Sequence, residues 1–119
     1  APLSSDPNEP IFKEYGFPGH TGLTHLCGER VYGFKVEITW EAFASPARAS
    51  EIIAYYRRKL GDAGFTAAGG KGIWRLPATA PRPQRVLEVM PVGADSPSKS
   101  CGKSPPAKTQ SIIVISKMS

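Results

Sequence analysis

The chain has 119 residues, of which 40% are hydrophobic and 9% aromatic, so length and composition predict one small domain with a modest core. This apolar content excludes a wholly disordered chain, and no apolar run is long enough to cross a bilayer. The net charge of +5 permits binding to a polyanion, but the basic residues are scattered except at residues 57–59. We therefore do not expect a nucleic-acid partner.

The first 30 residues show no sustained hydrophobic periodicity. Residues 1–10 contain three prolines and are typical of a leader or linker, which leaves residues 11–119 as a single domain. Glycines and a proline make regular structure improbable between residues 15 and 22. We expect this segment to lie over the domain, with Phe17 or Leu23 packed against the core.

The clearest strand signal is an alternation across residues 31–40. Every second position is apolar: Tyr32, Phe34, Val36, Ile38 and Trp40. A period of two places these side chains on one face, which should meet the core, while Lys35, Glu37 and Thr39 should meet water. A half-exposed sheet of this kind favours antiparallel pairing and offers an edge strand to a partner strand.

Residues 46–60 carry the one convincing helix signal. Ser45 is a good N-cap, and Pro46 fits the first helical position. The basic residues 57–59 lie in the last turn, where they complement the helix dipole, and Gly61 or Gly64 can end the helix. One apolar stripe follows helical spacing: Ala49, Ile52, Ile53, Tyr56 and Leu60.

Further strand signals follow the helix. Residues 65–68 and 72–76 form either one merged strand or a hairpin across Gly69 and Gly70. Residues 85–90 are a third strand, and the β-branched run at 112–115 is typical of a central strand. The predicted fold class is therefore α+β, a twisted antiparallel sheet of about four strands with one helix packed on one face, in the order β-α-β-β-β.

Cys27 and Cys101 are the only cysteines, and each lies in a polar stretch that contains glycine. In a small, loop-rich domain such a pair predicts a disulfide, although two free thiols or a redox pair are alternatives. Their wide spacing argues against a redox centre of the Cys-x-x-Cys type. A disulfide in turn predicts an extracytoplasmic setting, either periplasmic, attached to the outer membrane or secreted.

The sequence contains no convincing catalytic motif. His20, His25 and Cys27 have the residue types of metal ligands, but a zinc site needs three or four ligands and no second cluster exists. No Gly-x-Ser-x-Gly elbow occurs, and residues 69–72 lack the spacing of a phosphate loop, so a hairpin turn is predicted there. We expect no metal, no cofactor and no enzymatic activity.

The predicted helix offers the best candidate contact surface. Tyr56 belongs to the apolar stripe, which places the adjacent Tyr55 at its border. An exposed tyrosine next to arginine is typical of binding hot spots, so the predicted contact residues are Tyr55, Arg57, Arg58 and Lys59. The alternative is a boundary tyrosine with its hydroxyl in water beside a solvated basic turn.

A packing pattern in this region resembles that of a group of bacterial domains. Ser-Pro at 45–46, IIAYYRRKL at 52–60 and AGF at 63–65 are similar to the helix of small, uncharacterised secreted or lipoprotein-type domains. The resemblance covers about a third of the chain and implies an extracytoplasmic α+β domain. It supplies no functional residues.

These observations favour a non-enzymatic, extracytoplasmic bacterial domain that binds a protein or another envelope component. One alternative is a binder of nucleic acid or acidic polysaccharide, whose affinity would fall steeply with salt. Another is a small metal-dependent enzyme that uses His20 and His25.

Overall fold

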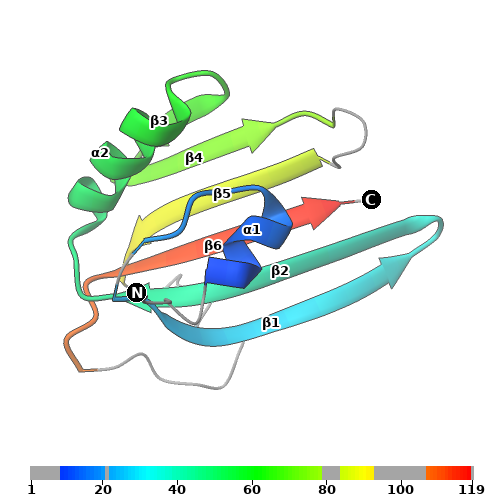
Figure 1. Ribbon diagram of the computed structural model, residues 1–119, viewed down its shortest axis with the longest axis horizontal. Helices are drawn as coiled ribbons and strands as arrows, with labels where there is room; N and C mark the ends of the chain where they lie inside the picture. The colour runs from blue at the N-terminus through cyan, green and yellow to red at the C-terminus, as the bar shows by residue number, and fades with distance from the viewer. Residues whose placement is uncertain (1–8, 21, 79–83, 93–106, 119) are drawn as a thin grey trace, which may run out of the picture.

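Six strands form one antiparallel sheet with two helices on one face, in a computed structural model that describes residues 9–20, 22–78, 84–92 and 107–118 (Figure 1). The strand order is β1-β2-β6-β5-β4-β3. The predicted four strands and single helix are therefore wrong, although the fold remains a small, sheet-rich α+β arrangement. The elements in chain order are α1 (Glu9–Tyr15), β1 (Thr24–Gly33), β2 (Val36–Ser45), α2 (Ala49–Leu60), β3 (Phe65–Ala68), β4 (Lys71–Leu76), β5 (Gln84–Pro91) and β6 (Ser111–Met118).

The alternating segment 31–40 is a hairpin and not one strand. Gly33 pairs with Val36, so the chain reverses at Phe34 and Lys35 and begins β2 at once. The reversal places Tyr32 on the face that carries the helices, while Val36 and Ile38 point to the opposite face. The prediction that all five apolar residues meet the core is therefore wrong, and Thr39, which was expected in water, is buried.

Helix α1 and strand β1 were not among the predicted elements. Helix α1 begins at Glu9, inside the expected leader, and residues 1–8 lie outside the described ranges. Its Phe12 and Tyr15, one turn apart, are buried against the sheet. In the segment after the helix, Phe17 and Leu23 are both buried, as predicted.

The central strands bury apolar side chains on both faces, which corrects the expectation of a half-exposed sheet. Helix α1 packs over β6 and helix α2 over β5, both on the same side, which we call the helix face. The core of the helix face comprises Phe12, Tyr15, Phe17, Leu23, Phe43, Ala49, Ile52, Tyr56, Trp74, Leu87, Val89, Ile113 and Ile115. A second cluster lies on the opposite face and comprises Leu26, Ala42, Ala44, Met90 and Ile112.

Helix α2 begins three residues later than predicted. Its N-cap is Arg48, which makes no side-chain cap, while the Ser45 hydroxyl accepts a hydrogen bond from the backbone N–H of Ala47 at 3.1 Å. Ser45 is thus still the last residue of β2, paired with Ser111, and a short turn separates it from the helix. The predicted apolar stripe is confirmed, with Ala49, Ile52 and Tyr56 buried and Ile53 and Leu60 packed at its margin.

The later strands match their predictions closely. β3 and β4 form a hairpin across Gly69 and Gly70, both of which have positive φ, as a two-residue turn requires. The β-branched run near the C-terminus lies in β6, in the middle of the sheet between β2 and β5.

Candidate functional site

The predicted contact residues all lie in the second half of helix α2 but on different sides of it, and most are engaged within the protein. The Tyr55 hydroxyl donates a hydrogen bond to the carbonyl oxygen of Gly19 at 2.6 Å, and its ring stands edge-on to His20 with 4.7 Å between centroids. Tyr55 therefore contributes to holding the segment between α1 and β1 against helix α2. The ammonium of Lys59 lies 5.8 Å from the centre of the same ring.

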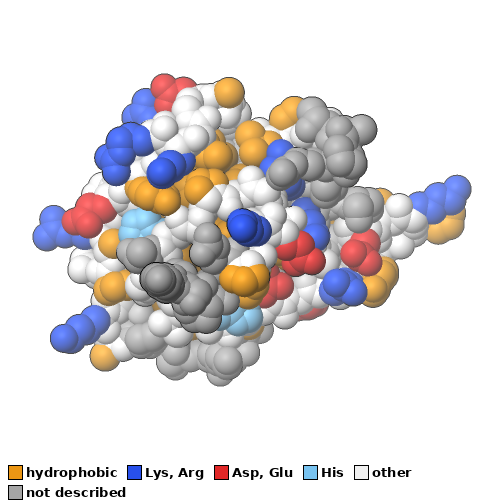
Figure 2. Space-filling view, in the orientation of Figure 1, with side chains coloured by type: hydrophobic (Ala, Val, Ile, Leu, Met, Phe, Trp, Pro, Cys, Tyr) orange, Lys and Arg blue, Asp and Glu red, His pale blue; other side chains and the backbone are white. Residues whose placement is uncertain are grey.

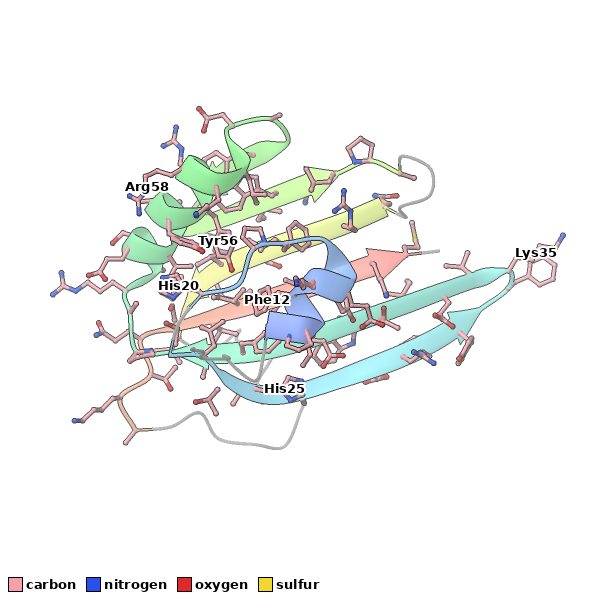
Figure 3. The ribbon with its side chains drawn as sticks, viewed as in Figure 1. Phe12, His20, His25, Lys35, Tyr56 and Arg58 are labelled. Carbon is pink, nitrogen blue, oxygen red and sulfur yellow. The ribbon has the colours of Figure 1, made fainter. Side chains whose placement is uncertain are left out.

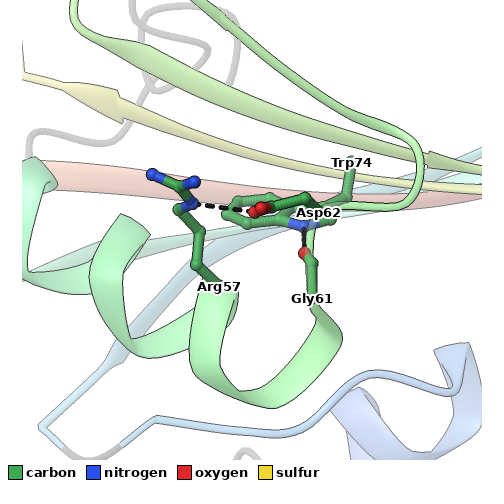
Figure 4. Close-up of polar contacts among 4 residues, drawn as sticks. All are labelled: Arg57, Gly61, Asp62 and Trp74. Carbon is green, nitrogen blue, oxygen red and sulfur yellow. Dashed lines mark hydrogen bonds and ion pairs between the residues drawn. The ribbon is translucent and has the colours of Figure 1, made fainter.

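The basic turn is held by an ion pair at the end of the helix. Arg57 Nε lies 2.9 Å from Asp62 Oδ1 (Figure 4), and the guanidinium lies over the ring of Phe65. The hydrogen bond and positive charge of Arg57 lower the pKa of the Asp62 carboxyl below its usual range. Arg58 is exposed and, among the residues that the structure describes, is the member of the basic turn without an ion-pair or ring partner.

The two histidines do not form a joint site. His20 lies against Tyr55 beside helix α2, whereas His25 lies on β1 (Figure 3). His25 Nε2 is 2.6 Å from the Glu41 carboxylate, and its ring packs on Phe43. Within the described ranges, no group of three His, Cys, Asp or Glu side chains is placed to hold a metal ion.

Cys27 lies on β1 and packs against the cluster of the opposite face. The described residues include no free cysteine. Cys101 lies outside the described residues, so the bridge between Cys27 and Cys101 stays a prediction.

A polar recess of about 320 Å³ lies between α1 and the β1–β2 pair. Its lining includes Glu14, Lys117, Glu41 and the buried ring of Tyr15, whose pKa is raised above its usual value mainly by burial. The Lys117 ammonium lies 3.7 Å from Glu14, and Glu41 is paired with His25. Because these charges already have partners within the protein, the recess favours no particular ligand.

Among the residues that the structure describes, the most exposed apolar surface is the end of the β1–β2 hairpin, residues 31–38, which we call the hairpin tip. Phe34 is 89% exposed and Tyr32 is 68% exposed. Figure 3 shows Lys35 at the projecting apex, and Figure 2 shows hydrophobic side chains beside a cation at that end. The large hydrophobic residues that are exposed within the described chain are Val31, Tyr32, Phe34, Val36, Ile38, Met118 and, away from this end, Val92.

The sheet register brings these side chains together. Val31 is paired with Ile38, which is paired in turn with Met118, so three apolar side chains form one row across β1, β2 and β6 on the opposite face. Tyr32 lies on the helix face of the same hairpin. Lys35 has a φ of 63°, which is uncommon for a non-glycine residue, and its ammonium lies 5.4 Å from the centre of the Phe34 ring.

The hairpin tip was missed because its alternation was interpreted as a core-facing strand. Gly33 was the available signal, since glycine next to alternating residues marks a turn as readily as a bend in a strand. Had the turn been placed there, Tyr32 and Phe34 could not have shared a face with Ile38.

Comparison with known proteins gives no functional guide. No protein family matches the chain, and no curated protein or solved structure is similar to it.

Proposed function

We propose that the chain is a non-enzymatic, extracytoplasmic bacterial binding domain and that the hairpin tip is its contact surface. The observation that carries this proposal is the concentration of exposed apolar side chains at one projecting end, while both sides of the central sheet are well packed. Contiguous patches of exposed apolar side chains mark interaction sites more often than single exposed apolar side chains do. The extracytoplasmic setting rests on the predicted disulfide.

The energetics favour contact through the aromatic residues. Full burial of a side chain such as Phe34 is favourable by roughly 1.5–3 kcal/mol of free energy relative to leaving it in water. Because Phe34 is 89% exposed in the folded chain, contact with a partner would supply nearly all of this gain. Aromatic side chains also dominate binding hot spots. None of the helices in the described ranges is long and apolar enough to span a bilayer.

Site-specific cross-linking tests this proposal. A photoreactive phenylalanine analogue at position 34 should label a component of the cell surface in the source organism. The same analogue at position 92 is the matched control, because Val92 is 41% exposed and lies outside the tip. Equal labelling from both positions, or none from position 34, would refute the tip as the contact surface.

A second candidate is polyanion binding by the basic turn of helix α2, which the exposed guanidinium of Arg58 favours. Each phosphate contact that a cation makes with duplex DNA contributes about −0.9 to the slope of log affinity against log salt concentration. Replacing Arg58 and Lys59 with alanine should therefore flatten the slope by roughly two, while Lys35→Ala at the other end should not. Absence of binding to both heparin and DNA at low salt eliminates this candidate.

A further inference from the structure

We propose that the hairpin tip inserts into the interfacial region of a lipid bilayer. This inference rests on the proposed function, because it names the partner of the same contact surface. Exposed apolar groups are distributed around the whole hairpin tip. Val31 and Ile38 lie on the opposite face, Tyr32 lies on the helix face, and Phe34 is at the apex.

An occupant must therefore meet the hairpin from more than one side. A flat protein surface would cover one face of the two strands and leave the apolar side chains of the other face in water. A bilayer surrounds whatever enters it, so one insertion event removes Val31, Tyr32 and Phe34 from water together. The observed arrangement fits a surrounding medium better than a flat partner.

The position of the charged side chains matches a shallow insertion. From the apex, the paired rows are Gly33 with Val36, Tyr32 with Glu37, and Val31 with Ile38. At about 3.4 Å per residue these three rows extend roughly 10 Å, which matches the depth of about 5–10 Å reached by interfacial segments.

A charged boundary follows in the next two rows. Arg30, paired with Thr39, lies on the helix face, and Glu29, paired with Trp40, lies one row further on the opposite face, so each face becomes charged just below the apolar rows. Glu37 lies within the rows, but its carboxylate is 3.9 Å from Arg30 Nε, which places the pair at the level of the lipid headgroups. The boundary sets the depth at which insertion should stop.

The cation at the apex specifies the lipid chemistry. The Lys35 ammonium has a long flexible stem that can reach back to phosphate groups while Phe34 enters the apolar zone. The net charge of +5 also favours an anionic surface. We therefore expect preference for vesicles that contain phosphatidylglycerol over vesicles of phosphatidylcholine alone.

Vesicle flotation tests the inference directly. The folded chain should float with vesicles of phosphatidylethanolamine and phosphatidylglycerol, and Phe34→Ala should weaken binding about 10- to 100-fold. Val92→Ala should bind as the wild type does. Lys35→Glu should weaken binding to anionic vesicles about 10- to 30-fold and leave weak binding to phosphatidylcholine unchanged.

A second measurement reports the insertion itself. In Phe34→Trp, the added indole should shift its emission to shorter wavelength on vesicle addition and be quenched by brominated acyl chains. The wild type supplies the baseline, because Trp74 is buried and Trp40 half-buried. An indole that stays in water while the protein is bound to vesicles overturns the insertion.

The outcomes separate this inference from the proposed function. Failure of the wild type to float at millimolar lipid overturns the bilayer as partner, and so does equal binding of wild type and Phe34→Ala. If position 34 then cross-links a protein in cells, the hairpin tip remains the contact surface and its partner is that protein. If neither vesicles nor cellular components engage position 34, both proposals fail.

Discussion

Gly64→Ala should destabilise the protein far more than Gly69→Ala, because only the first glycine lies against backbone. Both residues have positive φ, 78° at Gly64 and 56° at Gly69. A Cβ at position 64 would overlap the carbonyl oxygen of Arg75, whereas a Cβ at position 69 would meet nothing within 4 Å. The two variants therefore share a conformational cost and differ in the steric one.

The magnitudes follow from these two terms. Left-handed backbone costs an L-residue roughly 1–2 kcal/mol, partly offset by the lower entropy of the unfolded alanine variant, so Gly69→Ala should lose about 1 kcal/mol. At position 64 the overlap is with β4, whose Arg75 N–H donates a hydrogen bond to Gly64 oxygen at 2.9 Å. Displacing that strand adds overpacking of about 1–3 kcal/mol and weakens the hydrogen bond, for a total of about 3–4 kcal/mol.

Urea unfolding followed by tryptophan fluorescence measures both losses, because Trp74 is fully buried and its indole N–H donates to Gly61 oxygen at 3.0 Å (Figure 4). The midpoint should fall clearly for Gly64→Ala and slightly for Gly69→Ala at unchanged slope. Equal losses would show that the strand yields to the methyl group, which would refute the close backbone approach as the reason for a glycine at position 64.

Three further predictions concern pH, the disulfide and the hairpin turn. Burial raises the pKa of both Tyr15 and Tyr56, so the unfolded chain loses these protons at lower pH than the folded protein does, and the unfolding free energy should fall above about pH 10. Tyr15→Phe should reduce that fall, and the same pH dependence of the unfolding free energy in wild type and variant would contradict the prediction. Replacing Cys27 and Cys101 with serine should lower the unfolding free energy by about 4 kcal/mol if the two cysteines close a loop through a disulfide. An unchanged unfolding free energy, together with a wild-type mass that is the same before and after reduction, would show two free thiols. Lys35→Gly should stabilise the protein by about 0.5–1 kcal/mol by relieving its positive φ, and equal or lower stability would show that the turn is unstrained.

The elements that could be predicted are those whose burial produces a long or unbroken pattern. Helix α2 has three turns and buries one stripe, so Ile52 and Tyr56 recur at helical spacing. Strand β6 lies between β2 and β5, and Ile112 and Ile113 are both fully buried on opposite faces, which explains its continuous apolar run. In these segments the local pattern and the tertiary environment agree.

The elements that escaped prediction are short or lie at the sheet edge. Helix α1 has 7 residues, fewer than the window over which helical periodicity is detectable, and buries only Phe12 and Tyr15 fully. Among the described residues, strand β1 is paired on one side only, and Leu26 is its one fully buried side chain. The register shifts between His25 and Cys27, so Leu26 sits at a bulge, which also breaks any alternation.

The candidate site illustrates a different limit of sequence patterns. Hydrophobic alternation identifies side chains that can share a face, but it does not say whether a core or a partner covers that face. Trp40 is partly buried against other side chains of the protein. Phe34, by contrast, is left almost fully exposed by the described residues. The same alternating pattern therefore leads to partial burial at Trp40 and to exposure at Phe34. The position of the turn between β1 and β2 decides which of the two a residue has.

The charges on β1 bear on which surface of the hairpin is used. An edge strand exposes unpaired backbone groups, and charged side chains near its middle discourage pairing with another chain. Glu29 and Arg30 occupy that position in β1, and any antiparallel pairing of two copies centred there would oppose like charges. These charges therefore protect the middle of the edge strand against pairing, while the apex beyond it exposes Tyr32 and Phe34. This contrast argues for contact through the hairpin tip and against the addition of a partner strand at the sheet edge.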